Sequence, residues 1–109
     1  MKIIPKLTLG GITYRNVEVE VGKYANNGAT SLVLYVTDDL YREPLAVASV
    51  NVPDFTPSEG CVWIKSYSEN EGMLEGLSSA GIIEPTGIKL LTGFSYVHEA
   101  RLLVGEENA

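Results

Sequence analysis

The sequence predicts an α+β fold in which one helix packs on an antiparallel sheet, and three observations predict it. Between positions 17 and 21, valine alternates with glutamate, which is the period of a strand with one buried face. Asn26-Asn27-Gly28 has the residues that hairpin turns favour. One segment with helical spacing follows several strands and precedes others, an order typical of α+β domains.

Turn residues and apolar runs set the order of the strands. Gly10-Gly11 predicts a tight turn after Leu7 and Leu9, and Pro53 ends a later strand because proline has no N–H for the ladder. Residues 84–87 predict a turn, and the even-numbered residues from Phe94 to Val104 are expected on one apolar strand face. The predicted strands cover about residues 7–9, 14–24, 32–36, 45–52, 61–64, 88–91 and 94–104.

The single predicted helix has a start signal and a stop signal. Ser68 fits an N-cap, and Glu71, three residues later, completes a capping box. Gly81 fits the position just after a helix, where a left-handed backbone angle ends it. The expected helix therefore runs from about Glu69 to Ala80, that is, over residues 69–80.

Gly72 and Gly76 stand four residues apart on one face of this helix. Each glycine inside a helix costs about 1 kcal/mol relative to alanine. Two of them on one face indicate a close backbone approach, either to the protein's own sheet or to another chain. We expect the approach to be to the protein's own sheet.

The size and composition indicate one folded domain. The 109 residues are 45% hydrophobic and 20% charged, as in ordinary globular proteins. No internal repeat, linker or low-complexity segment interrupts them. We expect a single α+β domain over residues 1–104 and a frayed tail over residues 105–109.

The charge disfavours nucleic-acid and membrane partners. The formal net charge is −6, and the eight lysines and arginines are scattered along the chain, whereas nucleic-acid binders gather them to displace phosphate counterions. No apolar run reaches the roughly 18 residues of a spanning helix. The apolar start of the chain stops at Pro5 and Lys6, too early for a secretion signal. We therefore expect a cytoplasmic protein.

The residues that usually carry chemistry are scarce. Cys61 and His98 are the only cysteine and histidine, too few for a structural zinc site. His98 is a candidate general base, and a Cys61–His98 nucleophilic pair is conceivable. The apolar neighbours of both residues favour packing roles instead. We predict that the protein is not an enzyme and holds no cofactor or metal.

The best candidates for partner contacts are acidic or aromatic. Glu69, Glu71 and Glu75 lie on the predicted helix and form a possible recognition face for a basic partner, although a solvated helix face explains them too. Tyr41 lies in a turn, and tyrosine combines apolar area with a polar tip. Asp38-Asp39 lacks the spacing of a calcium loop and is interpreted as a turn.

Two segments, Lys23-Tyr24-Ala25-Asn26-Asn27-Gly28-Ala29 and Tyr67–Glu75 continued through Gly81–Gly87, carry a resemblance. They resemble a family of short proteins from phages and mobile elements of Gram-positive bacteria, over about residues 14–103. The resemblance implies no activity and no catalytic residue. It implies a setting in which small proteins often bind a host protein.

Three functional hypotheses follow, in order of preference. The first is a non-enzymatic protein-interaction domain, an accessory factor of a phage or mobile element, which uses the acidic helix region or an exposed strand edge. The second is a structural component that self-associates through a strand edge. The third is a small enzyme or ligand-binding protein that uses His98.

Overall fold

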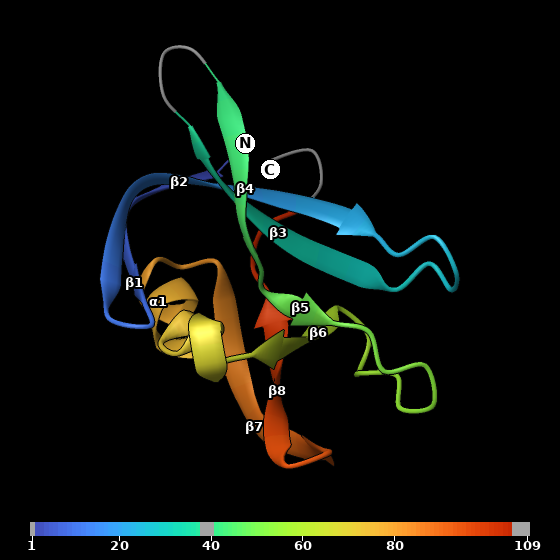
Figure 1. Cartoon of the computed structure of the whole chain (residues 1–109). Helices are drawn as coiled ribbons and strands as arrows, with labels where there is room; N and C mark the ends of the chain where they lie inside the picture. The colour runs from blue at the N-terminus through green and yellow to red at the C-terminus, as the bar shows by residue number, and fades with distance from the viewer. Residues whose placement is uncertain (1, 38–40, 106–109) are drawn as a thin grey trace.

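The residues described by the structure, a computed structural model, are 2–37 and 41–105, and they form an α+β fold with two antiparallel sheets (Figure 1). The N-terminal sheet has the strand order β1-β2-β3-β4, and the C-terminal sheet has the order β5-β6-β8-β7. The prediction of an α+β fold is confirmed, whereas the expectation of one sheet is wrong.

The elements follow one another along the chain, and residues 51–60 form a longer connection between β5 and β6. The N-terminal sheet consists of β1 (Lys2–Leu9), β2 (Ile12–Lys23), β3 (Thr30–Thr37) and β4 (Arg42–Val47). The C-terminal sheet consists of β5 (Ser49–Val50), β6 (Cys61–Lys65), β7 (Ile83–Thr92) and β8 (Ser95–Leu102). A 3-10 turn, η1 (Ser68–Asn70), and the helix α1 (Met73–Ser79) lie between β6 and β7.

The chain passes from one sheet to the other at Ala48. The N–H of Ala48 donates to the Leu32 carbonyl of β3 at 2.9 Å, and its carbonyl accepts from the Lys65 N–H of β6 at 2.9 Å. Ala48 is fully buried, so a larger side chain there would collide with the core. This crossing divides the predicted strand 45–52 into β4 and β5, and it explains why one expected sheet is two.

The first hairpin bends at Asn16. Asn16 has a φ of 55°, the left-handed conformation that asparagine tolerates better than most residues. Before the bend Tyr14 packs against the core, and after it Val17 and Val19 are buried. The side chains of β2 that face the core are thus even-numbered before Asn16 and odd-numbered after it, because one left-handed residue interrupts the alternation of a strand.

Both predicted hairpin turns are present. Gly10 and Gly11 have φ angles of 56° and 82° and join β1 to β2 as a two-residue turn. The turn at Asn26-Asn27-Gly28 is wider than a two-residue turn, because the loop closes through the Tyr24 N–H, which donates to the Ala29 carbonyl at 2.8 Å.

The predicted capping box is wrong, and the helix is shorter than residues 69–80. Ser68 has a φ of 55° and begins η1. The N-cap positions of η1 and α1 are Tyr67 and Gly72, which make no side-chain capping bond, and the Ser66 hydroxyl accepts from the Leu74 N–H of α1 at 3.0 Å. Gly72 is the residue before α1, with a φ of 94° that favours glycine. The C-terminal prediction is confirmed: Gly81 has a φ of 77°, and the Gly81 and Ile82 N–H groups donate to Ser78 and Leu77.

The C-terminal hairpin differs from its prediction in extent and in phase. The expected turn at 84–87 lies inside β7, as a register irregularity between Pro85 and Lys89. Phe94 lies in the turn to β8 and is fully exposed rather than on the buried face. Val97 and Glu99, from the opposite face of β8, are buried.

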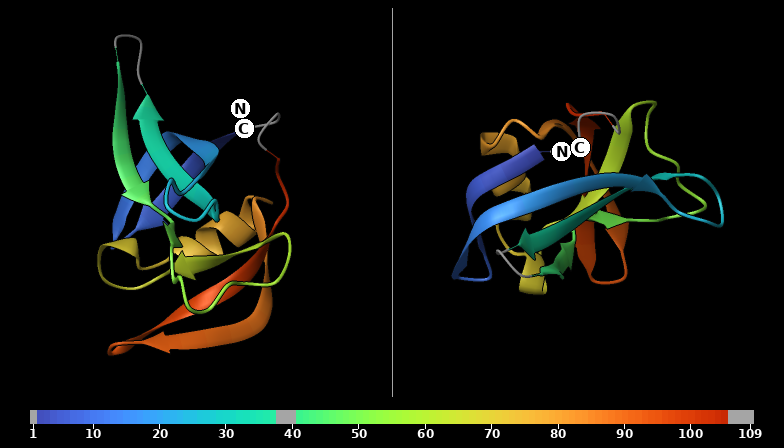
Figure 2. Two further views of the ribbon diagram at one scale, coloured as in Figure 1. Left: turned by 90° about the vertical axis from the view of Figure 1, so that its right-hand side faces the viewer. Right: turned by 90° about the horizontal axis from the view of Figure 1, so that it is seen from above.

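The core lies between the two sheets and α1. α1 contacts β1 of one sheet and β6 and β7 of the other, so it fills the space that the sheets leave between them (Figures 1 and 2). Met73 and Leu77 are the fully buried residues of α1 in this core. The predicted Asp38-Asp39 turn and all but the first residue of the predicted tail 105–109 lie outside the described residues.

Candidate functional site

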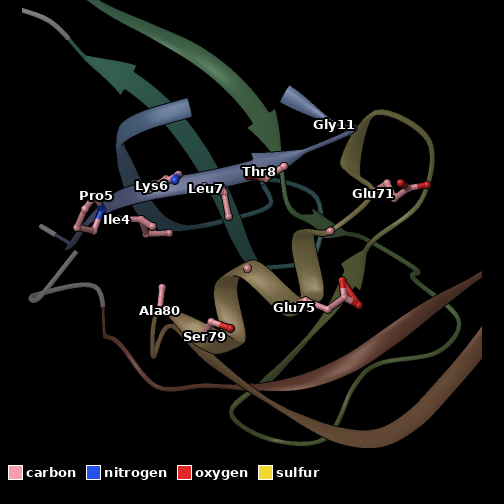
Figure 3. Close-up of a pocket in the computed structure, with 12 residues that line it drawn as sticks. Ile4, Pro5, Lys6, Leu7, Thr8, Gly11, Glu71, Glu75, Ser79 and Ala80 are labelled. Carbon is pink, nitrogen blue, oxygen red and sulfur yellow. The ribbon is translucent and has the colours of Figure 1, made fainter. Parts of the chain in front are cut away.

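A groove of about 740 Å³ runs between strand β1 and helix α1 (Figure 3). β1 contributes consecutive residues from Ile4 to Thr8, so the edge of the strand forms one wall. α1 and the two residues that flank it contribute Gly72, Gly76 and Ala80 to the other wall. Small side chains on one side and a strand edge on the other give the groove an apolar floor and a main-chain wall.

The two glycines let the helix approach β1. A Cβ atom on Gly72 would lie 2.8 Å from the Thr8 carbonyl oxygen, and one on Gly76 would lie 2.3 Å from Cδ1 of Leu7. The Gly10 N–H at the tip of the hairpin also donates to the Glu71 carbonyl at 2.9 Å. The prediction that Gly72 and Gly76 mark an approach to the protein's own sheet is therefore confirmed.

The structure separates the three predicted glutamates. Glu71 and Glu75 line the groove toward the tip of the hairpin, whereas Ile4, Pro5 and Ala80 line its other end (Figure 3).

Glu69 lies outside the groove, where its Oε1 is 2.6 Å from Nζ of Lys65. This hydrogen bond to Lys65 lowers the pKa of the Glu69 carboxyl. Glu69 is thus neutralised locally, which leaves Glu71 and Glu75 as the acidic residues of the groove.

Tyr41, the fourth predicted contact, lies far from the groove. It immediately precedes β4, which begins at the top of the molecule in Figure 1, away from α1. Its side chain is exposed, as predicted. The predicted contact residues therefore belong to at least two surfaces.

Cys61 and His98 do not form a pair. Cys61 of β6 lies opposite Arg101 of β8, and His98 lies opposite Ile64. The two positions are three residues apart along the ladder, about 10 Å, and an odd offset puts their side chains on opposite faces of the sheet. Burial and the nearby Glu99 carboxylate raise the pKa of the Cys61 thiol, which disfavours the nucleophilic thiolate. Residues 2–37 and 41–105 contain no cluster of three or more potential metal ligands.

A buried carboxylate, Glu99, is the residue that sequence reasoning missed. Its side chain on β8 is 3% exposed. One carboxylate oxygen accepts from the N–H and the hydroxyl of Ser58, both at 3.0 Å, and the other accepts from the Thr86 hydroxyl at 2.8 Å. Glu99 therefore fastens the loop before β6 and the irregular part of β7 to the centre of the C-terminal sheet.

These donors lower the pKa of Glu99, the Ser58 N–H contributing most, against an opposing effect of burial. The same loop is held by Trp63, whose indole N–H donates to the Phe55 carbonyl at 2.7 Å. The arrangement satisfies the carboxylate with neutral donors and leaves no oxygen directed at a ligand. We interpret Glu99 as a structural residue.

Comparisons with known proteins add no relative. No protein-family model matches the chain, and neither the curated proteins nor the solved structures contain a match to it. Within the described ranges, no helix is long and apolar enough to cross a membrane.

Proposed function

We propose that the protein is a non-enzymatic protein-interaction domain that holds an extended segment of a partner protein in the β1–α1 groove. The observation that carries the proposal is the composition of this groove. A strand edge that α1 covers only in part faces the helix across a groove of about 740 Å³, and two glutamates lie at one end of this groove.

The edge of β1 favours an extended backbone in its occupant. β1 is an outer strand of its sheet and pairs with β2 alone among the described residues. Because Leu9 and Ile12 flank a two-residue turn, the strand alternation directs the N–H and C=O of Lys6 away from β2. An added strand can satisfy such groups, which is a common mode of peptide recognition.

The charges favour a basic residue at one end of the bound segment. Glu71 and Glu75 are exposed and line the groove at the same end, near Gly11. A lysine or arginine of the partner placed there would face two carboxylates, whereas Lys6 alone represents the opposite sign in the groove lining. Exposed pairs of this kind contribute specificity and association rate more than affinity.

The resemblance to proteins of phages and mobile elements suggests a host protein as the partner and an accessory role for this chain. The proposal needs neither a cofactor nor a metal.

Selection of random peptides displayed on phage against the folded protein tests this proposal. We expect enriched peptides that contain lysine or arginine and whose binding is lost with the double variant Glu71→Lys, Glu75→Lys. Glu43→Lys and Glu59→Lys change exposed glutamates elsewhere and serve as the matched charge control. Failure to enrich any peptide, or equal binding to both double variants, would overturn the proposal.

A further inference from the structure

The C-terminal sheet has its own open edge at β7. β7 is an outer strand of this sheet and pairs with β8 alone within the part of the chain that the structure describes. Because Thr92 and Ser95 flank a two-residue turn, the alternation of the pair turns the backbone N–H and C=O of Lys89 and Leu91 away from β8. These groups face solvent along a strand edge that can accept a further strand.

Exposed apolar side chains surround this edge. Phe94 is fully exposed, and Leu91, Ile88 and Tyr96 are 57%, 51% and 46% exposed. All four belong to the β7–β8 hairpin, which projects from the molecule at the end opposite the start of β4 (Figures 1 and 2). An apolar cluster of this kind beside an open strand edge is typical of a surface that another chain covers.

The charge distribution indicates which chain covers it. Residues 85–98 contain no aspartate or glutamate, although the protein carries 14 acidic residues and a net charge of −6. The basic residue within this stretch is Lys89, whose Nζ lies 4.6 Å from the centre of its own Tyr96 ring. This stretch offers no carboxylate that could pair with a basic partner, and it offers a polyanion only one lysine. Two copies of this acidic chain, in contrast, can meet here without bringing carboxylates of this stretch together.

We propose that the β7 edge and the exposed side chains of its hairpin form a homodimer interface. An antiparallel strand edge is complementary to itself about a two-fold axis. With the axis at Leu90, Lys89 lies opposite the partner's Leu91, and their outward N–H and C=O groups meet. Leu90 then lies beside the partner's Leu90, and the two sheets become one sheet of eight strands. This surface is distinct from the β1–α1 groove, so it leaves the groove open.

Sedimentation of the full chain over a wide concentration range tests the dimer. We expect a monomer–dimer equilibrium between about 10 µM and about 1 mM, since the contact is small for a protein interface. The double variant Leu91→Lys, Phe94→Ser should weaken dimerisation about tenfold or more. The control is Ile12→Lys on β2, because Ile12 is 57% exposed, as Leu91 is, but lies in the other sheet.

A cysteine at the axis tests the register independently. Residues facing each other at a non-hydrogen-bonded antiparallel position have Cα atoms about 4.5 Å apart, within the range of a disulfide. In a Cys61→Ser background, Leu90→Cys should form a cross-linked dimer under air faster than Ile12→Cys, although Ile12 is the more exposed side chain.

Two results would overturn the proposal. One is a protein that remains monomeric at about 1 mM, above the concentration at which weak specific dimers form. The other is a dimer that persists unchanged in Leu91→Lys, Phe94→Ser, or that cross-links no faster at position 90 than at position 12. Neither result bears on peptide binding by the groove.

Discussion

Strands β1 and β7 each form one outer edge of a sheet, and the two edges have different surroundings. β1 faces α1, which approaches so closely that Gly72 has no room for a Cβ atom beside Thr8. The far half of β7, in contrast, faces solvent with Ile88 and Leu91 exposed. The β1 edge is thus partly covered by α1, whereas the far half of the β7 edge is exposed to solvent.

The interactions that hold the two edge strands in place differ as well. β1 is held to α1 by a close main-chain approach at a glycine, which requires the absence of a side chain. β7 is held to β8 at its irregular segment by the Thr86 hydroxyl, which donates to the buried Glu99 carboxylate. The contact at β1 depends on close packing and on an uncharged hydrogen bond between Gly10 and Glu71, whereas the contact at β7 depends on a charged carboxylate. The effects of pH and of substitution therefore distinguish the two contacts.

The largest expected effect is at the β1 edge. Gly72→Ala places a Cβ 2.8 Å from the Thr8 carbonyl oxygen, on a residue with a φ of 94°. The left-handed strain costs roughly 1–2 kcal/mol, and overpacking against backbone adds a similar amount. We expect the free energy of unfolding to fall by about 3 kcal/mol in denaturant titration.

Gly81→Ala is the matched control for that substitution. Gly81 ends the same helix with a φ of 77°, and a Cβ there would meet nothing within 4 Å. Gly81→Ala should therefore lower the free energy of unfolding only through backbone strain, by about 1 kcal/mol. Equal losses of unfolding free energy in the two variants would mean that a Cβ atom at position 72 fits beside β1 without strain.

The fastening of the β7 edge gives the next largest effect. Glu99→Gln replaces one acceptor oxygen by an amide NH₂ that faces hydroxyl and N–H donors. We expect the free energy of unfolding at neutral pH to fall by about 2 kcal/mol. Glu69→Gln, which changes an exposed carboxylate paired with Lys65, should have a much smaller effect that disappears in high salt.

The pH dependence of the Glu99→Gln difference has a definite sign. The folded-state pKa of Glu99 is lowered, so its ionised form stabilises the fold above the unfolded-state pKa of about 4.3. That stabilisation is lost as the pH falls through the lowered pKa. The gap between wild type and Glu99→Gln should therefore be constant above about pH 5 and should narrow below it. A gap that widens in acid would contradict the role assigned to Glu99.

The smallest effect on stability is expected at the bare part of β7. Leu91→Lys and Phe94→Ser change exposed side chains, and substitutions of this kind usually alter the free energy of unfolding by less than about 0.5 kcal/mol. Measured in dilute, monomeric protein, the double variant should unfold like the wild type. A large loss there would show that these residues stabilise the monomer and are not kept for an interface.

Local signals in the sequence predicted local structure well. The Gly10-Gly11 turn, the glycine after the helix and the close approach at Gly72 and Gly76 each follow from the backbone freedom of glycine. The start of the helix was mispredicted because the Ser68–Glu71 spacing fits a capping box, whereas the chain instead forms a 3-10 turn that receives the tip of the first hairpin.

Long-range features could not be predicted. The crossing at Ala48 depends on two strands that are far apart in the sequence, and the burial of Glu99 depends on a loop that folds back from residues before β6. Glu71 and Glu75 were selected for their charge, and the groove beside them became visible once β1 was placed against α1. Alternation alone could not reveal which edge the helix covers.

Amide hydrogen exchange at two protein concentrations tests the contrast between the edges most directly. The outward amides of Lys89 and Leu91 on β7 should become protected between about 20 µM and about 1 mM, as the bare edge pairs with its copy. The outward amide of Lys6 on β1 should exchange equally at both concentrations, because we propose that this edge binds a segment of another protein and not a second copy of this chain. Protection that rises at Lys6 and not at Lys89 and Leu91 would contradict the account.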